Sequence, residues 1–140
     1  MRLHVIARGK IGRSSESELV QRYAKRLTWP FLLTQLPESG GNVPAPLTPK
    51  RDILLDERGS AMSSEKFAEL LGGWRDGGIR EARFFIGAAD GHGEAARGEA
   101  DLLLCFGAMT WPHLLVRAML MEQLWRATSI LAGHPYHREG

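Results

Sequence analysis

The side chains best suited to chemistry gather in the last thirty-five residues of this 140-residue chain. A polar tail that begins at Gly133 carries His134, Tyr136, His137 and Arg138. Chain ends without a task usually fray and consist of small and charged residues, so this tail indicates contact with a ligand or with RNA. Aromatic rings stack on bases and cations contact phosphates, which favours a nucleic-acid partner. A metal site is not expected, because no cysteine or acidic residue stands at ligand spacing.

An uncharged loop precedes the last helix. Residues 106–111 read Phe-Gly-Ala-Met-Thr-Trp, and Pro112 follows in a position that suits the first turn of a helix. One interpretation is a buried connection to that helix. The other is a slot for a flat apolar ring such as adenine, held mainly by backbone amides and carbonyls. The residues alone leave both interpretations open.

A glycine-rich segment, Gly87 to Gly93, is either a tight turn or a place where the backbone approaches a ligand closely. It does not complete the dinucleotide fingerprint G-x-G-x-x-G, because Ala96 stands where the third glycine is required. No lysine follows the glycines as it does in a phosphate-binding loop. Nucleoside triphosphate chemistry is therefore not expected.

Hydrophobic periodicity alternates between strand and helix patterns along the chain. We expect strands at residues 3–7, 31–35, 51–55, 83–86 and 102–106, and helices at residues 15–27, 64–75, 94–100 and 113–131. Residues 36–50 hold four prolines and are expected to form a loop rather than packed structure, and residues 56–60 are expected to end the third strand. This order predicts an α/β fold with a mostly parallel sheet flanked by helices. Such sheets bind ligands beyond the carboxyl ends of their strands, so the loops after Leu55, Ile86 and Cys105 predict a small-molecule site.

The last helix is apolar on more than one side. Its stripes comprise Val116, Met119, Leu120, Gln123, Leu124 and Ala127 on one side, and Leu114, Ala118, Met121 and Trp125 on the other. A helix that is apolar nearly all round must be buried on both sides, and we expect one side to be a subunit interface. His113 and Arg117 are four residues apart and share a face near the helix start. Glu122 and Arg126 have the same spacing and are expected to form an ion pair.

Composition sets the broad class. At 15.5 kDa the chain is expected to form one domain over residues 1–140. Eighteen Lys and Arg against sixteen Asp and Glu give a net charge of +2, which permits a nucleic-acid partner without arguing for one. The longest apolar stretch, residues 102–109, is too short to span a bilayer, and the first residues lack a signal-peptide layout. With Cys105 as the only cysteine, an internal disulfide is excluded and a cytoplasmic protein is expected.

Taken together, these motifs resemble the RlmH family, the SPOUT-class enzymes that methylate N3 of pseudouridine 1915 in 23S ribosomal RNA. The match spans nearly the whole chain and includes Leu-Asp-x-x-Gly at residues 55–59 and the strand end Ile86-Gly87, with Gly91 after it. Its most specific part is Met-Thr-Trp-Pro-His at residues 109–113, followed by Arg117, by Glu-Gln-Leu-Trp-Arg-Ala at residues 122–127 and by Tyr-His-Arg at residues 136–138. The chain departs from the family pattern at Ala88, where a second glycine is usual, and in its short, proline-rich residues 36–50.

The resemblance implies a SPOUT-type α/β fold with a C-terminal trefoil knot and a homodimer joined through the C-terminal helix. It implies S-adenosyl-L-methionine as the cofactor and 23S rRNA in the ribosome as the partner, with no membrane or metal involved. Implied cofactor contacts are Leu55, Gly87, Phe106, Gly107, Ala108, Met109, Thr110 and Trp111. Implied substrate contacts are His113 and Arg117, and implied catalytic residues are Tyr136, His137 and Arg138. The alternatives are a SPOUT methyltransferase that acts on another RNA base, and a non-catalytic ribosome-binding factor.

A mechanism follows as a hypothesis. N3 of the base loses a weakly acidic proton as it attacks the methyl group. His137 is the candidate proton acceptor, because imidazole titrates near neutral pH. Tyr136 would orient the base, while Arg138 and Arg117 would stabilise the charge that develops on it.

Overall fold

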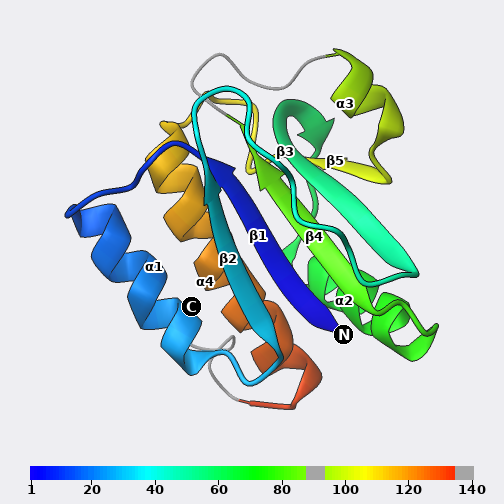
Figure 1. The fold of residues 1–140 in the computed structure, drawn as a ribbon. Helices are drawn as coiled ribbons and strands as arrows, with labels where there is room; N and C mark the ends of the chain where they lie inside the picture. Colours follow the sequence, from blue (N-terminus) through cyan, green and yellow to red (C-terminus); the bar gives the residue numbers. More distant parts are fainter. Residues whose placement is uncertain (88–93, 135–140) are drawn as a thin grey trace.

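Five parallel strands form one sheet, in the order β2-β1-β4-β3-β5, in a computed structural model that describes residues 1–87 and 94–134 (Figure 1). The strands are β1 (Arg2–Arg8), β2 (Phe31–Leu36), β3 (Lys50–Ser60), β4 (Glu81–Ile86) and β5 (Leu102–Leu104). The helices are α1 (Ser15–Arg26), α2 (Ser64–Asp76), α3 (Glu94–Glu99) and α4 (His113–Leu131). Each neighbouring pair of strands is parallel, which confirms the predicted α/β fold.

One face of the sheet is covered by helices. Figure 1 shows α1, α4 and α2 behind the strands, and α4 packs against both of the others. Alternate strand residues, such as Val5 of β1 and Phe84 of β4, point into this core. The hydroxyls of Ser14 and Ser63 cap α1 and α2 by accepting a hydrogen bond from a backbone N–H three residues on.

The two apolar sides of α4 are buried within one chain. The Trp125 ring lies 5.6 Å from the Tyr23 ring of α1, centroid to centroid, and Leu120 and Leu124 are fully buried in the core. Gly72 of α2 faces Leu131 near the end of α4. Most of the apolar pattern is therefore satisfied by α1, α2 and the sheet, while Val116 and Met119 stay only partly buried.

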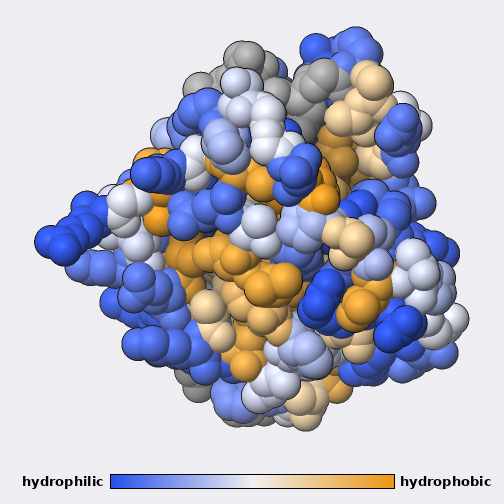
Figure 2. Space-filling model, viewed as in Figure 1, coloured by the Kyte–Doolittle hydropathy of each residue, from blue (hydrophilic) through white to orange (hydrophobic). Residues whose placement is uncertain are grey.

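No long helix of the described residues covers the other face of the sheet. The segment between β2 and β3, residues 37–49, crosses in front of this face (Figure 1). It lacks regular structure and most of its residues are exposed, as expected, but some of its backbone groups are bonded to the sheet. The Pro44 carbonyl accepts a hydrogen bond from Arg83, and the Leu47 N–H donates one to Glu81. Apolar surface remains in the middle of this face (Figure 2), and the exposed apolar side chains include Leu32 of β2 and Val43 of the crossing segment.

Strand β3 is longer than predicted. It was expected to end before Asp56, but it continues to Ser60, which pairs with Leu104 of β5 after a shift in register. Gly59 makes this extension possible, because a Cβ atom there would lie 2.6 Å from the backbone of Leu103. Only glycine allows the two strands to approach so closely.

Candidate active site

A cleft of about 730 Å³ opens where β4 and β5 end, beside residues 55–58 of β3. We call it the strand-end cleft. Its walls come from the residues that follow Leu55, Ile86 and Leu104 and from the start of α4. Because the strands are parallel, their carboxyl ends lie at one edge of the sheet, and three segments distant in sequence meet there. This is the position that the three post-strand loops predicted.

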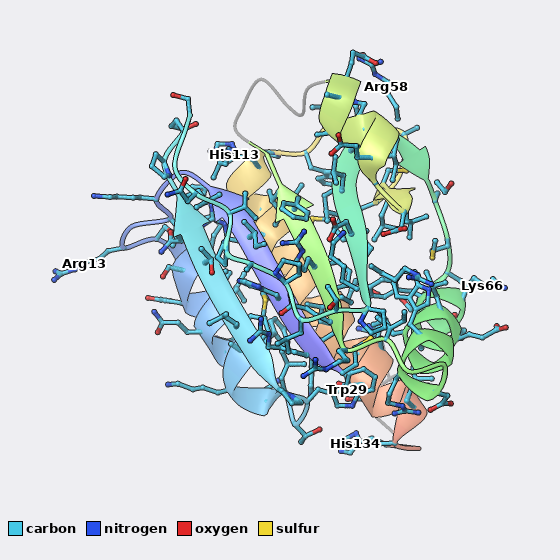
Figure 3. All side chains as sticks on the ribbon, turned by 45° about the vertical axis from the view of Figure 1, so that its right-hand side comes forward. Arg13, Trp29, Arg58, Lys66, His113 and His134 are labelled. Carbon is cyan, nitrogen blue, oxygen red and sulfur yellow. The ribbon has the colours of Figure 1, made fainter. Side chains whose placement is uncertain are left out.

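Most of the predicted cofactor contacts line the strand-end cleft. These lining residues are Leu55, Gly87, Phe106, Gly107, Met109, Thr110 and Trp111. Ala108 is exposed and is not among the lining residues. His113, a predicted substrate contact, also lines the cleft, and Figure 3 shows it at the start of α4, at the same end of the sheet as Arg58. The structure brings these side chains together, while their roles stay predictions.

Gly107 shapes the segment that follows β5. Its φ angle is +120°, in the region that side chains strongly disfavour, although a Cβ atom there would meet open space. The requirement for glycine is therefore conformational rather than steric. The resulting turn leaves Met109 76% exposed beside the cleft.

One wall of the strand-end cleft is charged, which the sequence interpretation missed. Asp56 accepts a hydrogen bond from Arg97 Nε at 2.7 Å and another from the backbone N–H of Arg58 at 2.9 Å. Thr110 donates to Glu57 across the cleft at 3.0 Å. The hydrogen bond from Arg97 to Asp56 raises the pKa of Arg97, so this cation stays protonated. The sequence predicts a small-molecule site at the residues after Leu55, but not that Asp56 and Glu57 give that site a charged wall.

The residues of the strand-end cleft fit a nucleoside cofactor. Small-molecule sites usually enclose about 300–1,000 Å³ and combine apolar walls with a few polar groups. Phe106, Met109 and Val116 supply apolar surface here, and the backbone of Gly107 borders the same space without a side chain. Thr110 and Glu57 supply polar groups that a ribose hydroxyl could join. Asp56 and Arg97 neutralise each other and keep that wall from repelling a charged ligand.

Arg117 does not reach the cleft. It is fully buried, and its guanidinium donates to Gln35 Oε1 at 3.1 Å and to the carbonyls of Arg8 and Gly9 at 3.2 and 3.1 Å. Burial lowers the pKa of this guanidinium, and the nearby Glu38 carboxylate offsets part of that effect. The prediction that Arg117 touches the substrate directly finds no support in this placement.

The three predicted catalytic residues, Tyr136, His137 and Arg138, lie outside the described residues, as do Ala88 and Gly91. Within residues 1–87 and 94–134, no group of three His, Cys, Asp or Glu side chains could hold a metal ion. In the same part of the chain, no helix has the length and apolarity needed to cross a membrane.

Comparison with known proteins decides the family. A family model described as "Predicted SPOUT methyltransferase" matches residues 1–137. The chain belongs to this family. Family membership confirms the predicted enzyme class, a methyltransferase, and agrees with the parallel sheet and its edge cleft.

Curated relatives are similar over their full length. The chain is 68% identical to "Ribosomal RNA large subunit methyltransferase H" of Erythrobacter litoralis (strain HTCC2594), covering 100% of both chains. It is 67% identical to the protein of the same name in Novosphingobium aromaticivorans, and 56% identical to the one in Zymomonas mobilis, again over 100% of both chains. These matches confirm the resemblance to the RlmH family.

Proposed function

We propose that this protein is one domain that methylates N3 of pseudouridine 1915 in 23S rRNA of the large ribosomal subunit, using S-adenosyl-L-methionine. The observation that carries the proposal is the strand-end cleft, in which segments 55–58, 86–87 and 104–113 meet in a chain of the SPOUT family. The name of the relatives, ribosomal RNA large subunit methyltransferase H, supports rRNA of the large subunit as the substrate. The C-terminal trefoil knot is part of this proposal, as is a cytoplasmic location.

Each part of the cleft has a proposed task. The backbone of residues 106–111 holds the adenine ring, and the side chains of Leu55 and Phe106 exclude water from it. The bond from Thr110 to Glu57 fixes the cofactor segment against β3. When bound, S-adenosyl-L-methionine supplies a methyl group on a positively charged sulfur. The cleft then contributes orientation, because an in-line arrangement of nitrogen, methyl carbon and sulfur removes much of the barrier.

The tail and His113 are proposed to act on the base. The reaction forms a bond from N3 to the methyl carbon, breaks the bond from that carbon to sulfur, and releases the N3 proton. We assign proton acceptance to His137 and stabilisation of the developing negative charge to Arg138, while Tyr136 orients the base. His113, at the mouth of the cleft, is proposed to contact the substrate nucleotide.

The decisive experiment separates binding, transfer and target. Calorimetry with S-adenosyl-L-methionine should show binding, and its absence in the dimer would favour a non-catalytic ribosome-binding factor. Mass spectrometry of 23S rRNA from a deletion strain should show loss of the methyl group at pseudouridine 1915. Loss at a different base would identify another RNA target of the same chemistry.

His137→Ala tests the proton acceptor. This variant should keep cofactor binding and lose methyl transfer to ribosomes. Near-full activity of His137→Ala would exclude His137 as the base.

We also propose that the active form is a homodimer joined along the outer side of α4. Met119 is half-buried there and borders an open hollow of about 500 Å³, together with Met62, Phe67 and Phe106. Apolar surface of this kind is typical of a symmetric subunit contact. The hollow shares Phe106 and Gly107 with the strand-end cleft, so a partner seated on it would adjoin the cofactor segment.

Light scattering tests the homodimer. Met119→Arg should convert the protein to a monomer and weaken S-adenosyl-L-methionine binding. The control Leu32→Arg adds the same charge at an exposed apolar side chain on the sheet face that residues 37–49 cross, and it should leave the dimer intact. A dimeric Met119→Arg variant would exclude this interface.

A further inference from the structure

Arg117 has an environment that core packing does not explain. Its side chain is fully buried on α4, yet it makes no ion pair with any described carboxylate, and its Nε lacks a hydrogen-bond partner among the described residues. A buried charge without a paired carboxylate is costly, and an apolar side chain of similar volume would pack more favourably. What the guanidinium does achieve is attachment of the backbone at Arg8 and Gly9 to the second turn of α4.

The attached segment is the connection between β1 and α1, residues 9–14, which we call the basic arm. Gln35 Oε1 links both parts, because it accepts from Arg117 Nη1 and from the backbone N–H of Ile11 at 3.1 Å each. At the far end, the Ser14 hydroxyl donates to the Ile11 carbonyl at 3.1 Å and caps α1. The backbone of the arm is therefore held at both ends.

Two cations project from this held backbone. Lys10 and Arg13 are exposed, and neither forms an ion pair within residues 1–87 and 94–134. Figure 3 shows Arg13 pointing away from the body of the molecule. Side chains with free charge on a fixed backbone are suited to a polyanion, because little conformational freedom of the chain is lost when they bind.

The basic arm lies at the same edge of the sheet as the strand-end cleft. Arg117 lies one helical turn beyond His113, which lines the cleft. β1, which leads into the arm, is the neighbour of β4, whose end at Gly87 lines the cleft as well. The arm and the cleft thus leave the same edge of the sheet.

We propose that the basic arm contacts phosphates of the RNA substrate next to the target nucleotide, and that Arg117 is the positioning residue that holds the arm for this contact. The inference rests on the proposed function, since the polyanion is the RNA whose base enters the cleft. Phosphate contacts set the register of a nucleic acid without reading its sequence. Arg117 therefore acts on the substrate through residues 9–14 rather than by touching it.

Salt dependence of ribosome binding tests the arm. Lys10→Ala/Arg13→Ala should weaken binding to unmethylated ribosomes about tenfold at low salt and reduce the slope of log affinity against log salt by about 1.5, as expected for two lost phosphate contacts. Calorimetric affinity for S-adenosyl-L-methionine should not change. The matched control Arg22→Ala/Lys25→Ala removes two exposed cations of α1 and should leave the slope as in the natural protein.

Arg117→Met tests the positioning role. Amide hydrogen exchange at residues 9–14 should speed up, and the salt slope should fall as in the arm variant. Combining Arg117→Met with Lys10→Ala/Arg13→Ala should add little, because both changes remove the same phosphate contacts. If Arg117→Met does not fold, Lys10→Gln and Arg13→Gln singly still test the arm, each reducing the slope by about 0.7.

Binding and transfer are read separately. The proposed phosphate contact of the basic arm would be overturned by an unchanged salt slope in the arm variant, or by an equal reduction in the α1 control. In either case, methyl transfer by the natural protein would still support the proposed function. If the arm variant reduces the salt slope but the natural protein transfers no methyl group, the proposed function is overturned and the phosphate contact of the arm is upheld.

Discussion

The two faces of the sheet are built on different principles. The face toward α1, α4 and α2 is apolar, with Val5 and Phe84 fully buried. The face under residues 37–49 buries charge instead: Glu81 is fully buried beside Arg2 and His4, and Arg83 pairs with Asp52 at 2.8 Å. Apolar packing depends on shape and is indifferent to pH, whereas buried ion pairs depend on protonation. The first face fixes α4 and the strand-end cleft, and the second holds the crossing segment.

The largest change in the free energy of unfolding should come from Phe84, and the adjacent Phe85 on the opposite face gives the comparison. Phe84 is fully buried, with its ring edge-on to Phe67 at 6.1 Å, so Phe84→Ala should lower the free energy of unfolding by about 4 kcal/mol. Phe85 is half-buried under Arg83 on the other face, and Phe85→Ala should lower it by about 1 kcal/mol. Urea unfolding measures both. Equal losses would refute the contrast between the faces.

Removing the partly buried carboxylate of Asp52 should have the next largest effect. Asp52→Asn leaves Arg83 with the Pro44 carbonyl but without its carboxylate, and should lower the free energy of unfolding by about 2 kcal/mol at neutral pH. The control Asp76→Asn removes an exposed carboxylate and should change it by less than about 0.5 kcal/mol. Although burial alone would raise the pKa of Asp52, the hydrogen bonds from Arg83 and Lys50 lower it overall. The pKa of Asp52 in the folded protein is thus lower than its ordinary value of 3.8. The contribution of Asp52 to the free energy of unfolding should therefore be lost only as the pH falls below 3.8.

The polar face should also make stability sensitive to mild acid. Burial lowers the pKa of His4 below 6.5. Glu81 has a smaller effect that raises this pKa, and Arg2 and Arg83 lower it further. The unfolded chain then binds a proton that the folded protein resists, so the free energy of unfolding should fall as the pH drops below 6.5. For one proton the slope is at most about 1.4 kcal/mol per pH unit. His4→Gln should show a shallower slope in unfolding measured from pH 7 to 5, and an identical slope would contradict the assignment.

The smallest change in stability is expected at the cleft. Met109 is 76% exposed, so Met109→Ala should alter the free energy of unfolding by less than about 0.5 kcal/mol. Its affinity for S-adenosyl-L-methionine should nevertheless fall several-fold, because the side chain lines the strand-end cleft. Leu32→Ala, on the sheet face that residues 37–49 cross, should leave that affinity unchanged in calorimetry. A stable Met109→Ala protein with full affinity would remove Met109 from the site.

Sequence patterns were enough for the elements and for the place of the cleft. The branched apolar residues of β1 and the two apolar stripes of α4 predicted bounds within one residue of those observed, because both elements are buried over most of their length. The segments after Leu55, Ile86 and Cys105 meet at one cleft as expected, although residues 56–60 continue β3 rather than form a loop.

Tertiary structure alone decided which distant atoms meet. The ion pair between Asp56 and Arg97 joins residues 41 positions apart. The hydrogen bonds from Arg117 to the carbonyls of Arg8 and Gly9 join residues 109 and 108 positions apart. The close approach of Gly59 to Leu103 extended β3 beyond its apolar run, and Arg83 and Glu81 drew the proline-rich segment onto the sheet. No periodicity records such contacts, because a charged side chain looks the same in the sequence whether it ends in solvent or in a buried pair. Local pattern determined what each segment becomes, and only the folded arrangement decided what its charges do.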